Sequence, residues 1–540
     1  MWLLGLFLLI APLISSCTHL PNETRSFTLL AMNDIYRIDG VDDGTSGGLA
    51  RVRGLRAELE KADPNVLLLH AGDFLFPSLL SRQYHGQQMI DVLNLLDGNP
   101  DTYDHRLFVT FGNHEFEKSQ VDDATLVDAR IEESQFAWLG SNIVFKKSET
   151  GQPLVESDNL TNHTMIYSGD VQIGLFSLTA DIKHPAYVAE FGKPESVARH
   201  LTRQLRDQGA DFVIAITHQP MSQDSALLDT LRADGPDLII GGHEHNRQSL
   251  QVNGRWVLKA DADARTATVI RVTLPHGGPP TVYWKFQKLH SPTVEPDPLV
   301  QARIDHWIRR HDEDYCQSVL KHPPGCLDKV LGKTQVRLTG EELEIRRYET
   351  NLGNWIADQA LLAFADQGAQ VAFINSGSLR LNQDIPAGTP ITRRHIEQLF
   401  AYPTPLKLLR MNGATLQKAI SHAVEDWTGN GWWLQVSGLA FSHDPQTESA
   451  DNFTLLTTEG PQSIHPDDQL VIVTNSFLAE GGDGYSMLSS TSVLNTAQAP
   501  DLKEFVIQRL KTTNIDGILP KVEGRICNSI RDGPCQAIMP

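Results

Sequence analysis

The sequence predicts an α/β fold arranged in two domains. Between residues 27 and 290, short apolar segments alternate with helix-like segments, and polar residues follow the ends of several apolar segments. The proline-rich stretch "LHSPTVEPDP" separates this region from a second one with the same alternation. Alternating strands and helices are typical of layered α/β folds, and a chain of 540 residues is long enough for two or three domains.

Six apolar segments of the first region have the length and composition of buried strands. They are "FTLLAM", "NVLLLH", "LFVTF", "QIGLFSL", "FVIAITH" and "LIIGG". Helix-like segments lie between several of them, at 49–62 and 195–209. Because sites of α/β folds form in loops at the carboxyl ends of strands, we expect the functional residues there.

Residues 291–330 are predicted to link the two domains. They contain turn-forming prolines and a polar helix over 298–316. The second domain is expected over 331–540. Its predicted strands are "VAFIN", "LKLLRMNG" and "QLVIVTNSF", and its predicted helices cover 351–366 and 413–426.

The first 17 residues, "MWLLGLFLLIAPLISSC", are predicted to be an export signal. Their apolar run is too short to cross a bilayer and is typical of a secretory signal. The ending "ISSC" resembles a bacterial lipoprotein signal, cut before Cys17, which then carries lipid. A plain secretory signal with an incidental cysteine is the alternative. Either way we expect an extracytoplasmic protein, in the periplasm or cell envelope of a bacterium and lipid-anchored in the first case.

The remaining four cysteines form two local groups, "CQSVLKHPPGC" and "CNSIRDGPC". An even number in an exported chain predicts disulfides, most simply Cys316–Cys326 and Cys527–Cys535, although other pairings are compatible with the sequence.

The formal net charge of -20 argues against a surface that coats nucleic acid, which requires a basic patch. It leaves open a small anionic substrate held in a local positive pocket. Nothing in the sequence indicates a protein partner.

Five fragments place metal-binding side chains at predicted strand ends. In chain order they are "AMNDIYR", "HAGDF", "FGNHE", "ITHQP" and "GGHEHN". The candidate ligands are Asp34, Asp73, Asn113, His218, His243 and His245. One such fragment alone is more often a turn, but five in this order indicate a site. Oxygen and imidazole donors suit two adjacent divalent ions of Mn, Zn, Co or Fe. Such a pair generates hydroxide at neutral pH and neutralises a phosphoryl group during in-line attack.

In this order the fragments resemble those of the calcineurin-like metallophosphoesterases and, more narrowly, of the exported bacterial 5'-nucleotidase and UDP-sugar hydrolase family. The resemblance implies a four-layer metallophosphoesterase domain (an α+β sandwich) over 26–290, followed by a smaller α/β nucleotide-binding domain. It implies that Asp34 and His245 hold the first ion and that Asp73 bridges. The second ion would be held by Asn113, His218 and His243.

The same resemblance assigns catalysis to "GNHE". His114 is expected to stabilise charge on the phosphoryl group or the leaving oxygen. Glu115 is expected to support its imidazole, because such rings need a partner for their other nitrogen.

Tyr36 departs from the family pattern, which opens with Asp-x-His and uses that histidine as a ligand of the first ion. A phenol is a poor ligand unless ionised, and its reference pKa is about 10. Tyr36 could ligate a strongly acidic ion such as Fe(III), could hydrogen-bond a bound water, or could weaken the first site.

The resemblance continues in the second domain through "RRYETNLGNWIADQAL", "INSGSLR" and "NSFLAEGGDGY". There the family binds a nucleoside between aromatic rings and its phosphates through arginines. Flat rings stack on any base, and guanidinium groups fit phosphate oxygens. The matching positions are Arg346, Asn375, Arg380, Tyr402, Phe477 and Asp483.

These expectations lead to three functional interpretations. The first is metal-dependent hydrolysis of nucleoside 5'-monophosphates in extracytoplasmic nucleotide salvage, extending to nucleotide sugars or 2',3'-cyclic nucleotides. The second is a phosphodiesterase or other phosphoesterase with an altered first metal site. The third is a catalytically inactive nucleotide-binding surface protein.

Overall fold

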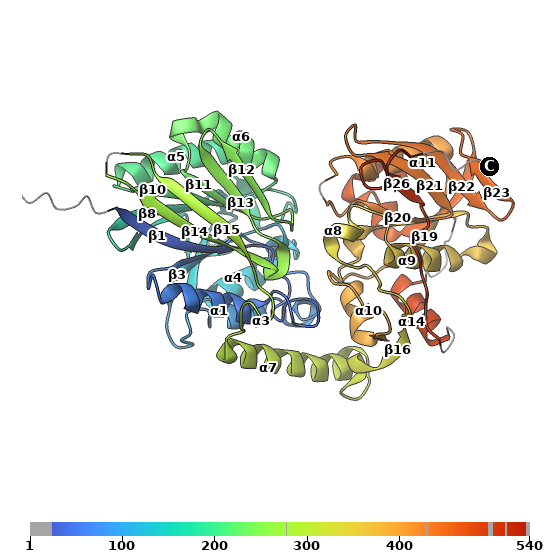
Figure 1. Ribbon diagram of the computed structural model, residues 1–540, viewed down its shortest axis with the longest axis horizontal. Coiled ribbons are helices and arrows are strands. Elements are labelled where there is room, and N and C mark those ends of the chain that lie inside the picture. The colour runs from blue at the N-terminus through green and yellow to red at the C-terminus, as the bar shows by residue number, and fades with distance from the viewer. Residues whose placement is uncertain (1–23, 277, 428, 495–499, 513–515, 536–540) are drawn as a thin grey trace, which may run out of the picture.

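The computed structural model describes residues 24–535, apart from 277, 428, 495–499 and 513–515. The predicted export signal and Cys17 lie outside the described residues. Figure 1 shows an N-terminal and a C-terminal half, with the long helix α7 (Pro298–Asp314) running between them. Of the helices described, none is long and apolar enough to cross a membrane.

Two sheets form the centre of the N-terminal half. Their strand orders are β15-β14-β1-β2-β3-β4-β6 and β12-β13-β11-β10-β8-β7. The six predicted strands are all present, and within each sheet they run parallel to one another. They are β1 (Arg25–Met32), β2 (Leu67–His70), β3 (Asp104–Thr110), β8 (Val171–Thr179), β10 (Phe212–His218) and β11 (Leu238–Gly241). The carboxyl ends of each parallel set therefore meet at one edge.

Apolar packing divides the N-terminal half into four layers. Leu29 of β1 and Ile214 of β10 belong to one buried cluster between the sheets. The other face of the first sheet is covered by α1 (Leu49–Glu60), and that of the second by α5 (Pro194–Asp207) and α6 (Met221–Leu231). This arrangement confirms the predicted fold class.

The C-terminal half is built on a five-stranded sheet with the order β20-β17-β24-β19-β25. Strand β17 (Val371–Asn375) is apolar up to its last residue because side chains on both of its faces are buried. Phe373 packs toward α11 (Gly413–Val424), whereas Ile374 packs on the opposite face with α9 (Asn351–Leu362). A strand that is buried on both faces has a continuous run of apolar residues in its sequence. A second, four-stranded sheet has the order β23-β22-β21-β26.

Both predicted disulfides are present. Cys316–Cys326 closes the segment after α7, and Cys527–Cys535 closes the C-terminal segment, each with an S–S distance of 2.12 Å.

Replacing Trp138 by alanine is expected to lower the free energy of unfolding by about 3–5 kcal/mol, because a large buried side chain is lost and a cavity remains. Trp138 is fully buried, and its Nε1 donates a 2.9 Å hydrogen bond to Ser134. The measurement is urea unfolding followed by circular dichroism. Tyr283→Ala is the control, since Tyr283 is 69% exposed and should change stability by less than about 0.5 kcal/mol. Equal effects of the two substitutions would contradict the layered packing described above.

Candidate active site

The six candidate metal ligands converge at the carboxyl ends of parallel strands. Asp34, Asp73 and Asn113 follow β1, β2 and β3, while His218 ends β10 and His243 and His245 follow β11. Four of these residues have left-handed backbone conformations, with φ of 52° at Asp34, 59° at Asp73, 94° at His243 and 61° at His245. Each costs on the order of 1–3 kcal/mol in a residue other than glycine, and such strain concentrates at functional sites.

Atoms at the centre of this cluster lack ordinary hydrogen-bond partners. His218 Nε2 lies 3.1 Å from Asp73 Oδ2 and 3.9 Å from Asp34 Oδ1, and all three side chains are buried. Within the described part of the chain, Asp34 Oδ1 and His218 Nε2 have no hydrogen-bond partner. A buried carboxylate oxygen and imidazole nitrogen without partners are costly, and bound metal ions would satisfy them. The donor set therefore fits a metal centre.

The electrostatics of the cluster also favour a bound metal ion. Burial acts to lower the pKa of His218, but Asp73 and Asp34 outweigh it and raise that pKa to about 10. Without a cation, the two buried carboxylates therefore hold a proton on the imidazole. A metal ion supplies that positive charge instead and leaves His218 neutral to bind it.

The remaining candidates border the same centre. His243 Nδ1 lies 3.2 Å from Asn113 Oδ1, and the backbone N–H of His243 donates to Asp34 Oδ2 at 2.9 Å. His245 Nε2 lies 3.5 Å from Asp34 Oδ1. The structure thus brings all six residues together.

Gly112 shows how tightly the backbone wraps this cluster. A Cβ atom at this position would lie 2.1 Å from Asp73 Oδ1. Only glycine leaves room for the carboxylate there.

His114 lies beside the candidate ligands and is held by a carboxylate different from the one expected. Its backbone N–H donates to Asp73 Oδ1 at 2.7 Å, and its ring Nδ1 lies 2.7 Å from Glu117 Oε2. Glu117 also pairs with Lys183 at 3.0 Å. Burial opposes the charge on Glu117, but His114 and Lys183 outweigh it and lower the pKa of Glu117 to about 2.

The expectation that Glu115 supports the His114 ring is wrong. Its carboxylate turns the other way and accepts backbone hydrogen bonds from Asp73 at 2.9 Å, Phe74 at 2.7 Å and Leu75 at 3.0 Å. Residues 114–116 form a single turn of 3-10 helix, so Glu117 lies one turn after His114 on the same side. Glu115 therefore shapes the loop that presents Asp73.

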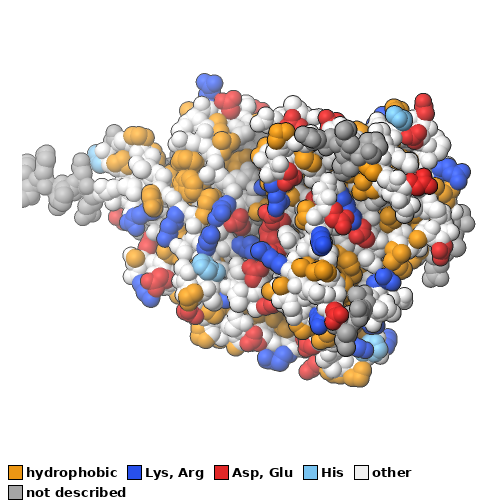
Figure 2. Space-filling view, turned by 45° about the vertical axis from the view of Figure 1, so that its right-hand side comes forward, with side chains coloured by type: hydrophobic (Ala, Val, Ile, Leu, Met, Phe, Trp, Pro, Cys, Tyr) orange, Lys and Arg blue, Asp and Glu red, His pale blue; other side chains and the backbone are white. Residues whose placement is uncertain are grey.

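A cavity of about 470 Å³ lies over the cluster and is lined by both halves of the chain. The N-terminal half contributes Asp73, Asn113, His114, His243 and His245 to its wall. The C-terminal half contributes every substrate-binding candidate: Arg346, Asn375, Arg380, Tyr402, Phe477 and Asp483. Figure 2 shows acidic and basic side chains interspersed over one face of the molecule.

The two arginines provide positive charge within the cavity. Arg346 lies against Glu342, and its Nε has no hydrogen-bond partner among the described residues. Arg380 is held by a 2.8 Å hydrogen bond from its Nε to the Gly377 carbonyl oxygen, and its guanidinium lies 6.0 Å from the centre of the Tyr402 ring.

The far end of the cavity presents an aromatic face and polar groups. Phe477 is 51% exposed, and its ring lies so close over Gly482 that a Cβ there would be 2.4 Å from it. Asn375 Nδ2 donates to Asp483 Oδ2 at 2.9 Å. An exposed ring beside fixed polar groups suits a base and its sugar.

Three residues of this region were not anticipated. Glu117 sits in "GNHEFE", where the spacing of a 3-10 turn could have indicated it. Trp432 also lines the cavity, within the glycine-rich "TGNGWW". Glu342 reaches across from the C-terminal half to within 2.8 Å of His245 Nδ1, and no local sequence signal marks it.

Comparisons with known proteins agree with this arrangement. Residues 14–247 match the family described as calcineurin-like phosphoesterase, and residues 330–490 match the family described as 5'-nucleotidase, C-terminal domain. The human protein named 5'-nucleotidase is 24% identical over 92% of this chain and 90% of its own length. The Bacillus subtilis protein named trifunctional nucleotide phosphoesterase YfkN is also 24% identical, over 90% of this chain and 34% of its own length.

Two solved structures share the fold over nearly the whole chain. The 5'-nucleotidase precursor from Thermus thermophilus superposes with a TM-score of 0.74 at 22% identity, covering 93% of this chain and 99% of that one. The sulfate thiohydrolase SoxB from the same genus gives 0.69 at 16% identity, covering 94% and 97%.

Glu342→Gln is expected to weaken metal binding by about 10-fold or more, because His245 Nδ1 loses its charged partner across the halves. The measurement is competition for Zn(II) or Mn(II) with a chelating dye. Glu341→Gln is the matched control: Glu341 caps α8 (Glu342–Ile345), its Oε2 accepting hydrogen bonds from the Leu343 and Glu344 backbone N–H groups. The idea fails if both variants bind the ion as the parent does.

Proposed function

The chain belongs to the 5'-nucleotidase family, in which a calcineurin-like phosphoesterase domain precedes a 5'-nucleotidase C-terminal domain, and it is a hydrolase of phosphate esters; from this premise we propose that it hydrolyses nucleoside 5'-monophosphates. The proposal extends to nucleotide sugars and 2',3'-cyclic nucleotides. Its role is nucleotide salvage outside the cytoplasm.

One observation carries the proposal. A single cavity of about 470 Å³ is lined by candidate metal ligands from one half and by two arginines and an exposed phenylalanine from the other. This arrangement supports a substrate with a phosphate at one end and a flat ring at the other, which describes a nucleotide. A bare phosphatase site would not need the ring and its polar neighbours.

The residues of the N-terminal half are proposed to hold two divalent ions, of Mn, Zn, Co or Fe. Bound there, the ions supply a hydroxide nucleophile and neutralise phosphoryl charge. The first is assigned to Asp34 and His245, with Asp73 as the bridge. The second is assigned to Asn113, His218 and His243. His114, oriented by Glu117, stabilises charge on the phosphoryl group or the leaving oxygen.

The residues of the C-terminal half are proposed to select the nucleotide. Arg346 and Arg380 hold phosphate oxygens, because their guanidinium groups fit such oxygens in pairs. Phe477 stacks on the base, and Tyr402 is proposed as the second ring. Asn375 and Asp483 contact the base and the ribose.

The domain boundaries and the export signal complete the proposal. The phosphoesterase domain covers 26–290, the linker 291–330 and the nucleotide-binding domain 331–540. The chain is proposed to be exported through residues 1–17 and anchored by a lipid on Cys17.

The decisive experiment is phosphate release from AMP by the protein lacking residues 1–17. The protein is stripped with EDTA, and Mn, Co, Zn, Mg and Fe are added back separately. Release should return with at least one ion and should fall by at least about 100-fold in His114→Ala, the usual scale for a lost acid–base or charge-stabilising group. If no ion restored phosphate release from AMP, the 5'-monophosphate assignment would be overturned. Hydrolysis of a diester but not of AMP would identify a phosphodiesterase instead.

Cys17→Ser is expected to move the protein from the membrane fraction to the soluble extracytoplasmic fraction, because the lipid attachment point is lost. The measurement is immunoblotting of separated membrane and soluble fractions. A parent protein already found in the soluble fraction would show that Cys17 is incidental and that the signal is a plain secretory one.

A further inference from the structure

A lysine is buried beside the histidine-bearing loops of the candidate site. Lys259 ends β13 (Arg255–Lys259), and only 1% of it is exposed. An ammonium group is strongly hydrated in water, so its burial requires oxygen partners that replace the lost solvent. Lys259 belongs neither to the candidate metal ligands nor to the candidate substrate contacts, so the proposed function leaves it without a role.

Three oxygens surround this ammonium group. Lys259 Nζ donates hydrogen bonds of 2.7 Å to the carbonyl oxygen of Gln219 and to Glu244 Oε2, and it lies 3.0 Å from Asp224 Oδ2. An ammonium group has three N–H donors, so each oxygen can be matched with one of them. The lysine is therefore paired on all sides and held in one position.

Two of these oxygens belong to the loops that carry the imidazole ligands. Gln219 directly follows His218 after β10, and Glu244 lies between the two histidines of the loop after β11. Glu244 contacts the first of these loops a second time, because its Oε1 accepts a hydrogen bond from the backbone N–H of Met221. Lys259 therefore joins the two loops that supply all three imidazoles.

The backbone of the loop after β11 needs such support. His243 and His245 have φ angles of 94° and 61°, in the left-handed region that residues other than glycine rarely adopt. Conformations of this kind persist only where surrounding contacts hold them. Glu244 stands between the two histidines, so the hydrogen bond from Lys259 acts on the most strained part of the loop.

A glycine makes room for this link between the loops. Gly241 ends β11 and lies opposite Lys259 in the parallel register of β11 and β13. A Cβ atom at Gly241 would lie 2.8 Å from Lys259 Cε and 3.1 Å from Asp224 Oδ2. Asp224 also accepts a 2.9 Å hydrogen bond from Gln219 Nε2, which closes the network around the ammonium group.

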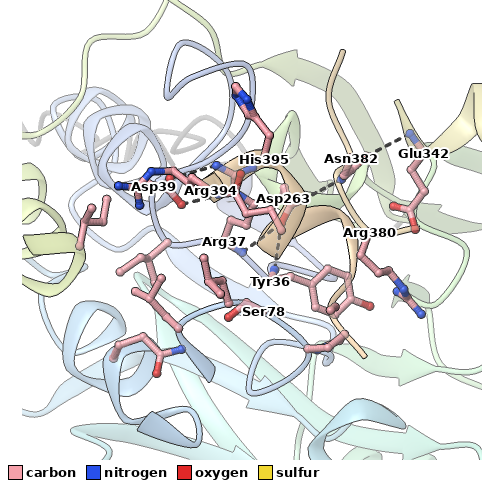
Figure 3. Close-up of a pocket in the computed structure, with 18 of the residues that line it drawn as sticks. Tyr36, Arg37, Asp39, Ser78, Asp263, Glu342, Arg380, Asn382, Arg394 and His395 are labelled. Atoms are coloured by element: carbon pink, nitrogen blue, oxygen red, sulfur yellow. Dashed lines mark hydrogen bonds and ion pairs between the residues drawn. The ribbon is translucent and has the colours of Figure 1, made fainter. Parts of the chain in front are cut away.

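The loop that carries Asp34 is held from a different side. The backbone N–H of Tyr36 donates to Asp263 Oδ1 at 2.9 Å, and Asp263 Oδ2 accepts a 2.6 Å hydrogen bond from Asn382 of the C-terminal half. Figure 3 shows this chain of contacts beside a second cavity of about 310 Å³. The residues assigned to the first ion thus have support from the C-terminal half, whereas Lys259 acts within the N-terminal half.

We propose that Lys259 is a positioning residue of the metal centre, which fixes the separation of the two histidine-bearing loops and with it the affinity for the second ion. The proposal rests on the two-ion centre of the proposed function. It concerns His218 and His243 most, because the ring of His245 is also held by the C-terminal half.

The experiment is competition for Zn(II) between a chelating dye and the metal-free protein lacking residues 1–17, titrated until both ions are bound. Asn113→Ala removes a ligand assigned to the second ion alone, so it identifies the binding step that belongs to that ion. In Lys259→Met we expect the affinity for the second ion to fall by about 10- to 100-fold and the affinity for the first to change by less than about threefold.

Arg56→Met is the matched control for the loss of a buried cation. Arg56 is 2% exposed and donates a 3.1 Å hydrogen bond to Asp104 Oδ1. Asp104 begins β3, at the opposite end of that strand from Asn113. The control should lower the unfolding temperature, as Lys259→Met does, and leave both Zn(II) affinities as in the parent.

Glu244→Gln is a second variant, which tests the same link without removing the lysine. An amide has one acceptor oxygen where the carboxylate has two, so it cannot accept the hydrogen bonds of both Lys259 and Met221. This variant should also weaken the second ion. Combining it with Lys259→Met should add little further loss, because both changes break one link.

Unchanged affinity for the second ion in Glu244→Gln and Lys259→Met would overturn the proposal, as would an equal loss of both ions. If Lys259→Met does not fold, Glu244→Gln alone decides the outcome. A parent protein that binds fewer than two ions would overturn the proposal together with the two-ion centre. Failure of AMP hydrolysis by a parent that binds two ions would overturn the substrate assignment alone.

Discussion

Two buried carboxylates at the centre of the candidate site are the constraint on which the rest of this structure depends. Asp34 and Asp73 lie at the ends of adjacent parallel strands, with essentially no exposure to water. Burying such charges is costly unless a counter-ion is present. The parallel topology brings imidazoles from the second sheet to the same edge, and the left-handed loops turn them inward. The fold therefore concentrates negative charge that either a metal ion or a proton on His218 must balance.

The C-terminal half takes part in this balance rather than only covering the site. Glu342 contacts His245, and Asn382 contacts Asp263, which in turn holds the backbone of Tyr36. A ligating imidazole binds well when its other nitrogen is held by an acceptor. Since that acceptor comes from the other half, metal affinity and the relative position of the two halves are linked. Any motion that separates the halves also loosens the His245 ring.

The sequence was sufficient for the fold class, the six central strands and the cluster of candidate ligands, because each depends on local signals. Apolar segments ending in Asp, Asn or His identify strands and the edge where they converge. The sequence was not sufficient for partners set by tertiary packing. Glu115 and Glu117 are both acidic and lie within three residues of His114, and only the turn geometry decides which one contacts its ring. Glu342 lies 97 residues from His245, and nothing local links them.

His245 shows why a single substitution in the first fragment matters to the whole centre. Its Nδ1 is held by Glu342 and its Nε2 faces Tyr36, so both nitrogens already have defined neighbours. An ion at the first position must therefore fit between Tyr36 and His245 or displace the phenol. A phenol that stayed protonated would fill the position and leave one ion to neutralise the phosphoryl group. In-line attack needs charge stabilisation at both the entering and the leaving oxygen, so the side chain at position 36 affects the chemistry through the room that it leaves beside His245.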